Sequence, residues 1–86
     1  MAFTADTLIL FGATGDLSQR MLLPSLCALH ADGLVAEHLH IVGTARSPHD
    51  DASFRAFAAQ ALERFLPPDR VQAIPGFLGR LFYQPL

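Results

Sequence analysis

The sequence predicts an α/β fold: a Rossmann-type doubly wound parallel sheet, of which a β-α-β-α-β portion is present. Three observations support this class. A continuously apolar run, Leu8–Phe11, leads directly into a glycine turn and a helical pattern. Two further strand-like segments follow, with a second helical pattern between them. Connections of this length between strands favour parallel, right-handed crossovers over hairpins.

Composition limits the classes of protein that this chain can represent. Its 86 residues suffice for one small domain, which buries about 60–65% of its unfolded surface. With 51% hydrophobic and 16% charged residues, it is not expected to be disordered. The net charge of −2 provides no basic patch for nucleic acid. The single cysteine, Cys27, is expected to be a small core residue in a reducing compartment.

Targeting signals are not evident in the sequence. The first six residues carry no Lys or Arg, and the first apolar run is shorter than the core of a signal peptide. No apolar run approaches the roughly 18 residues that span a bilayer. We therefore expect a cytoplasmic protein that does not bind membranes.

The first strand, Leu8–Phe11, is apolar on both faces, which is typical of a strand buried inside a parallel sheet. Both crossover helices of a β-α-β-α-β unit pack on the same face, so the other face of this strand would be bare. The simplest explanation is that the chain is the first part of a larger doubly wound domain, cut at Leu86.

The first helix is expected after the glycine turn. Its apolar residues recur at helical spacing: Leu22, Leu26 and Leu29, flanked by Met21 and Leu23. Asp16 lies where an N-cap or first-turn acid belongs, and Gly33 is the expected stop. Pro24 removes one backbone hydrogen bond, which predicts either a kink there or a helix start near Arg20.

The second strand is expected over Leu39–Ser47, running into a loop at Gly43. A second helix is expected over Asp50–Leu66, ended by two prolines. Its apolar stripe consists of Phe54, Phe57, Ala58, Ala61, Leu62 and Phe65. We interpret this stripe as core, since it lacks the cationic neighbours of a base-stacking platform. Residues 69–74 suggest one helical turn, and residues 80–86 begin a third strand.

The glycine turn has the spacing Gly12-x-x-Gly15, with no third glycine at Leu17 or Ser18. A glycine at the end of a buried strand lets a ligand approach the backbone closely. The helix that follows directs unpaired amides and the positive end of its dipole at the same place, which favours a phosphate. In the dinucleotide-binding fold this is the pyrophosphate site. The alternative is an ordinary strand-to-helix turn of any α/β protein.

The end of the second strand distinguishes the two nicotinamide coenzymes. NAD-binding proteins usually carry an acid there for the ribose hydroxyl, whereas an arginine suits the 2′-phosphate of NADP. This chain has Arg46, with Thr44 and Ser47 as hydroxyl donors. A guanidinium matches a phosphate in a bidentate manner. The pattern predicts NADP binding; the alternative is an ordinary surface arginine.

The same residues resemble the N-terminus of the glucose-6-phosphate dehydrogenase family. The family's opening motif resembles G-[AG]-[ST]-G-D-L-[AS]-x-R, with a proline a few residues later and a strand that ends in G-x-A-R. The resemblance is strong over residues 7–47 and holds in outline beyond them. The matching residues are Gly12, Ala13, Thr14, Gly15, Asp16, Leu17, Ser18, Arg20, Pro24, Gly43, Ala45, Arg46 and Ser47.

The resemblance implies an NADP-dependent oxidoreductase of glucose metabolism. Residues 1–86 would be the N-terminal part of its NAD(P)-binding Rossmann domain, truncated before the catalytic and substrate domain. The family oxidises C1 of glucose 6-phosphate to 6-phosphogluconolactone, passing a hydride to NADP at the entry to the pentose phosphate pathway. For the full-length enzyme, it implies glucose 6-phosphate as a partner and a homo-oligomer.

The resemblance also implies roles for individual residues. The Gly12–Ser18 backbone and Thr14 would contact the pyrophosphate, and Arg46 and Ser47 the 2′-phosphate. Asp16 would brace the loop and cap the helix. The implied cofactor-binding residues are Gly12, Ala13, Thr14, Gly15, Asp16, Leu17, Ser18, Arg46 and Ser47.

Two departures from the family pattern bear on catalysis. Met21 stands where many members carry a basic residue, which leaves Arg20 as the only cation nearby. The family's catalytic histidine dyad lies in a later region. No catalytic residue is therefore predicted here, and the 86 residues alone are expected to be inactive, since hydride transfer needs a base.

The remaining histidines show no pattern of a functional site. They are scattered and have no metal-ligand spacing, so we expect surface or packing roles and no metal. These residues are His30, His38, His40 and His49.

Two alternative functions stay open on the sequence. One is an extended short-chain dehydrogenase, but Ser18 replaces its third glycine and Tyr83 lacks the lysine four residues later. The other is a non-catalytic nucleotide-binding or protein-interaction module.

Overall fold

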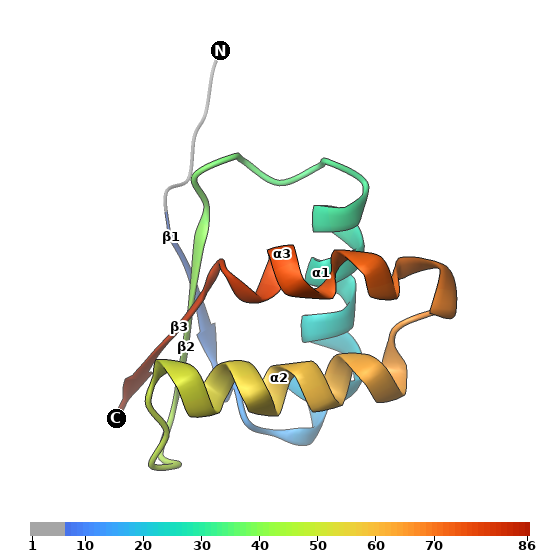
Figure 1. Ribbon diagram of the computed structural model, residues 1–86. Coiled ribbons are helices and arrows are strands. Elements are labelled where there is room, and N and C mark those ends of the chain that lie inside the picture. The colour runs from blue at the N-terminus through green and yellow to red at the C-terminus, as the bar shows by residue number, and fades with distance from the viewer. Residues whose placement is uncertain (1–6) are drawn as a thin grey trace.

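A three-stranded parallel sheet forms one side of the molecule, and the helices all cover the same face of it (Figure 1). The computed structural model describes residues 7–86. Strands β1 (Thr7–Phe11), β2 (His40–Ala45) and β3 (Leu81–Pro85) lie in the order β1-β2-β3. Helical crossovers join consecutive strands. The predicted α/β class and the incomplete parallel sheet are confirmed.

The first helical segment begins at Asp16 and contains a π-helical turn, η1 (Ser18–Leu22), before the regular helix α1 (Leu23–Ala31). The amide of Leu23 donates to the carbonyl of Ser18, five residues earlier. Pro24 has no amide hydrogen and cannot complete a regular turn, so a widened turn accommodates it. The predicted helix start near Arg20 is wrong, because the helical segment begins at Asp16, and the alternative of a kink at Pro24 stays a prediction.

The predicted apolar face of α1 is confirmed in part, since Leu22 and Leu26 pack against the core and are partly buried. Leu23, Pro24 and Cys27 are buried, whereas Leu29, which the spacing assigns to the core, is 41% exposed. Cys27 is confirmed as a core residue, and burial raises the pKa of its thiol. The predicted stop is also confirmed, with Gly33 at a φ of +72°.

Helix α2 (Asp51–Phe65) matches its prediction closely. Asp50 caps it: the amide of Ser53 donates to Asp50 Oδ1 at 2.7 Å, and Ser53 Oγ accepts from the Asp50 amide at 3.0 Å. These hydrogen bonds hold the pKa of Asp50 below its ordinary value. The buried stripe consists of Phe54, Ala58, Ala61 and Leu62. The other two predicted members, both phenylalanines, are half-buried.

Gly43 lies inside β2, so the predicted loop at this position is wrong. The strand continues to Ala45, with Gly43 opposite Leu10 of β1 and Tyr83 of β3. A Cβ atom on Gly43 would lie 2.5 Å from Phe54 Cζ and 2.8 Å from the Cβ of Ala13. The glycine is therefore needed for close packing.

Between α2 and β3 the chain forms more helix than the sequence indicates. The predicted turn at residues 69–74 is the 3₁₀-helix η2 (Pro68–Ala73), and a further short helix, α3 (Ile74–Leu78), follows it. Ile74 and Phe77 of α3 are buried in the core. None of the helices formed by residues 7–86 has the length and hydrophobicity needed to cross a membrane.

The second face of the sheet is bare, as expected from the apolar first strand. Leu10 and Ile41 are buried on the helix-covered face. On the other face, Ile9 is 55% exposed and Phe11 72% exposed. Within residues 7–86, this face of the sheet therefore presents large apolar side chains to solvent.

His30 of α1 packs against the residues that precede β3. Arg80 Nε donates to His30 Nδ1 at 2.9 Å, and the His30 ring lies 5.8 Å from that of Phe77. Arg80 also donates to the carbonyls of Ala36 (2.8 Å) and Leu39 (3.0 Å). His30 therefore has the predicted packing role, linking α1 to the start of β3.

We expect His30 to make the fold less stable at acidic pH. Burial, and then the positive charge of Arg80, lower the pKa of His30 from its usual 6.5. As pH falls, His30 is therefore protonated in the unfolded chain before it is protonated in the folded one. The contribution of His30 to stability is complete above pH 6.5 and is lost as pH falls through the folded-state pKa. His30→Gln, which can still accept from Arg80, should flatten the profile of urea unfolding between pH 7.5 and 5. The matched control is His38→Gln, at an exposed position. Equal pH dependence in wild type and His30→Gln would contradict this account.

Candidate functional site

The glycine turn forms an open backbone cradle at the end of β1. Gly12 has a φ of +66°, and a Cβ placed on it would meet nothing within 4 Å, so the space above it is free. The Gly15 amide donates to the Gly12 carbonyl at 2.9 Å, and the Gln19 amide donates to Gly15 at 3.1 Å. The amides of Asp16, Leu17 and Ser18 have no such partner within residues 7–86, and free amides at the start of a helix can bind an anion.

A second loop, Ala45–Ser47, leaves the same end of the sheet at β2. Its Arg46 is exposed and forms no hydrogen bond, ion pair or aromatic contact with residues 7–86. The other five arginines all have partners: Arg20, Arg55, Arg64, Arg70 and Arg80. Arg46 thus presents a free guanidinium, the group that binds a phosphate best.

The two loops are joined directly. Thr14 Oγ1 lies 3.0 Å from Ser47 Oγ, and the Ala13 amide donates to the Thr44 carbonyl at 3.2 Å. The structure therefore brings the glycine turn and the arginine loop together, although about 30 residues separate them in sequence. A hydroxyl has one donor and two acceptor positions, so Ser47 can accept from Thr14 and still donate to a ligand oxygen.

Buried side chains limit what some of the predicted residues can offer. Ala13 is 0% exposed and Ser18 is 2% exposed, so a ligand above the turn can reach only their backbone. The Ser18 hydroxyl has no partner within residues 7–86. Thr44, which the sequence suggests as a hydroxyl donor, is also buried. Its carbonyl, and not its hydroxyl, contacts the glycine turn, by accepting from the Ala13 amide. Leu17, in contrast, is 60% exposed.

Asp16 pairs with Arg20, one helical turn later, rather than capping the helix. Asp16 Oδ2 lies 3.5 Å from the Arg20 guanidinium, and both side chains are largely exposed. Exposed pairs of this kind are worth at most about 0.5 kcal/mol. Arg20 is therefore held only weakly.

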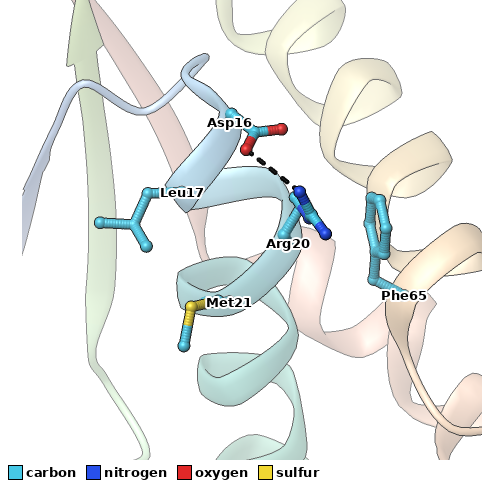
Figure 2. Close-up of a pocket in the computed structure, with 5 residues that line it drawn as sticks. All are labelled: Asp16, Leu17, Arg20, Met21 and Phe65. Carbon is cyan, nitrogen blue, oxygen red and sulfur yellow. Dashed lines mark ion pairs between the residues drawn. The ribbon is translucent and has the colours of Figure 1, made fainter.

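A hollow of about 380 Å³ lies beside this ion pair, between the first helical segment and the end of α2 (Figure 2). Its lining residues are Asp16, Leu17, Arg20, Met21 and Phe65. Figure 2 shows Asp16 and Arg20 on the side of the helix that faces Phe65, with Leu17 and Met21 projecting from the other flank. Met21 is 59% exposed. The hollow therefore shares Asp16 and Leu17 with the residues that the sequence predicts to bind the coenzyme.

The histidines do not form a site in the part of the chain that the structure describes. The His40 ring packs edge-on against that of Phe82, with the ring centroids 5.1 Å apart, and His49 Nδ1 lies 2.9 Å from Ser53 Oγ. No group of three or more potential ligands within residues 7–86 could hold a metal ion.

Tyr83 of β3 contacts the loop that carries Arg46, and the sequence did not predict this contact. Its hydroxyl lies 2.5 Å from the Ser47 carbonyl oxygen and 3.1 Å from that of Ala45. The only available signal was its place in the third strand, and its contact with the loop depends on the pairing of β3 with β2.

Comparison with known proteins agrees with this geometry. The family model described as "Glucose-6-phosphate dehydrogenase, NAD binding domain" matches residues 9–86. Two relatives are named glucose-6-phosphate 1-dehydrogenase. The one from Zymomonas mobilis is 58% identical over 85 residues, covering 96% of this chain and 18% of its own. The one from Gluconobacter oxydans is 43% identical over 77 residues, covering 87% of this chain and 16% of its own.

A solved structure with the same fold supports the match. Glucose-6-phosphate dehydrogenase in complex with its substrate glucose 6-phosphate superimposes with a TM-score of 0.81 at 29% identity. The match covers 100% of this chain and 18% of that one. The chain thus spans less than a fifth of the length of these relatives. It belongs to the glucose-6-phosphate dehydrogenase family, in which residues 9–86 match the NAD-binding domain.

Proposed function

We propose that this chain is the NADP-binding part of a glucose-6-phosphate dehydrogenase. The whole enzyme would oxidise C1 of glucose 6-phosphate to 6-phosphogluconolactone, the reaction that opens the pentose phosphate pathway. The observation that carries the proposal is the free guanidinium of Arg46 on a loop joined to the glycine turn by Thr14 and Ser47. Two adjoining phosphate sites suit a dinucleotide that carries a diphosphate and a 2′-phosphate.

The diphosphate is assigned to the cradle formed by Gly12–Ser18. Support comes from the open space above Gly12 and from the first-turn amides that follow Gly15. Backbone amides and the helix dipole suit a negative ligand without requiring a charged side chain. Leu17 and Ser18 contribute through their amides, and Thr14 contributes its hydroxyl.

The 2′-phosphate is assigned to Arg46 and Ser47. A guanidinium and a hydroxyl both donate to phosphate oxygens, whereas NAD presents only a ribose hydroxyl at this place. Within residues 44–49 there is no carboxylate that would repel the phosphate or hold a ribose hydroxyl. The loop therefore favours NADP over NAD.

When bound, the nicotinamide of the coenzyme accepts the hydride from the sugar. Within residues 7–86, no histidine forms a hydrogen bond to a carboxylate. We therefore propose that the base that takes the proton of the sugar hydroxyl comes from outside this stretch, and that these residues bind and orient the coenzyme.

We expect the 86-residue chain to bind NADP at least about 10-fold more tightly than NAD, since one charge-assisted contact to the extra phosphate is worth about 1.5–3 kcal/mol. Titration calorimetry with each coenzyme measures the ratio.

With glucose 6-phosphate and NADP, the chain alone should form no NADPH. A hybrid in which it replaces the matching segment of the Zymomonas mobilis relative should form NADPH. Equal affinity for the two coenzymes would contradict the assignment, as would an inactive but folded hybrid.

A further inference from the structure

The side chain of Tyr83 connects the arginine loop to the core of the protein. Its hydroxyl donates toward the carbonyls of Ser47 (2.5 Å) and Ala45 (3.1 Å), the two residues that flank Arg46. A phenol hydroxyl has a single proton, and the shorter distance assigns it mainly to Ser47. The contact is buried: Tyr83 is 7% exposed.

Tyr83 is itself held from three directions. Its amide donates to the carboxylate of Asp51 at 2.7 Å, which ties β3 to the start of α2. Its ring lies 5.2 Å from that of Phe54 and 5.5 Å edge-on from that of His49. A tyrosine so constrained has little freedom to move, so its hydroxyl is a fixed point for the loop.

The Tyr83 hydroxyl positions the loop, and the two carbonyls that it contacts do not depend on it for a hydrogen-bond donor. The Ala45 carbonyl also accepts from the Leu86 amide, and the Ser47 carbonyl also accepts from the His49 amide, both at 3.0 Å. Loss of the phenol would leave neither carbonyl without a donor. The fold should therefore tolerate the loss, while the loop becomes free to shift.

We propose that Tyr83 is a positioning residue that makes the coenzyme site selective for the 2′-phosphate. The inference rests on the proposed NADP function. By fixing the Ser47 carbonyl, Tyr83 sets where Ser47 Oγ and the neighbouring Arg46 guanidinium meet the phosphate. Ser47 also carries the link to Thr14, so the same contact fixes the distance between the two phosphate sites.

The test is Tyr83→Phe in the 86-residue chain, with calorimetric dissociation constants for NADP and NAD. Loss of one hydrogen bond that orients the loop is expected to lower the NADP-to-NAD affinity ratio about 3- to 10-fold, with NAD binding changed less than about 2-fold. The control is Ile41→Val, a fully buried substitution at the far end of β2. It should lower stability and leave the ratio unchanged. A folded Tyr83→Phe chain with the wild-type ratio would overturn the inference.

A second measurement does not depend on the variant folding. Tyr83 is the only tyrosine among the 86 residues, so 3-fluorotyrosine labels this site alone. Its ¹⁹F resonance should shift on titration with NADP and shift clearly less with NAD. Equal shifts with both coenzymes would refute the role of Tyr83. If the wild-type chain does not distinguish NADP from NAD at all, the proposed function itself fails, and the two failures are thus told apart.

Discussion

Replacing Arg46 with alanine is expected to weaken NADP binding about 10- to 150-fold and to change NAD binding less than about 2-fold. A hydrogen bond to a charged group contributes about 1.5–3 kcal/mol, and this guanidinium is free of protein partners within residues 7–86. Arg46→Glu should weaken NADP further, because it places a carboxylate against the 2′-phosphate. Calorimetric titration with both coenzymes at fixed ionic strength measures these effects.

The matched control for Arg46 is Arg64→Ala. Arg64 is an exposed arginine near the end of α2 that stacks over Phe65, so its removal changes the net charge equally. The control should bind both coenzymes like the wild type. If the two alanine variants lose the same NADP affinity, the effect reflects net charge, and the assignment of the 2′-phosphate to Arg46 is wrong.

Gly43→Ala is expected to destabilise the fold by about 1–3 kcal/mol, the usual cost of overpacking a core. The added methyl group would lie 2.5 Å from Phe54 Cζ and 2.8 Å from Ala13 Cβ. Because Ala13 belongs to the glycine turn, we expect the substitution to displace the backbone of that turn as well. For a domain of this size each kcal/mol lowers the melting temperature by roughly 4–8 °C. Thermal unfolding followed by circular dichroism measures the change.

Two variants separate overpacking from a general effect of replacing glycine. Gly79→Ala is the control, since Gly79 has a φ of −63° and its new methyl group would find its nearest neighbour at 3.4 Å. It should melt at or slightly above the wild-type temperature. Adding Phe54→Leu to Gly43→Ala removes the ring atoms that clash and should make the glycine substitution less costly. Additive losses in the double variant would show that Phe54 is not the obstacle.

Local patterns in the sequence were sufficient for much of the fold and part of the site. The run at Leu8–Phe11 predicts β1, and the apolar stripe and the two prolines after it predict α2 to within one residue at each end. Gly12, Gly15 and Arg46 stand out because each follows a strand, where α/β proteins bind ligands. Family membership followed from the same short segments.

Other features were missed because their causes lie outside the local segment. The spacing of the leucines does not reveal the π-helical turn at Ser18–Leu22, which precedes α1. The short helix α3 contains Pro75 and Gly76, which weaken any helical pattern. Gly43 looks like a loop residue until Phe54 and Ala13 are placed beside it.

The sequence by itself determined most of the strands and helices and the groups that we propose for the coenzyme, because backbone propensity and side-chain type act over a few neighbouring residues. Only the tertiary structure decided how those groups meet. The parallel pairing of β1, β2 and β3 carries Thr14 to Ser47 and Tyr83 to the Arg46 loop, across about 30 to 40 residues of chain. Contacts of that range depend on strand register and on the packing of α2, which no local pattern specifies.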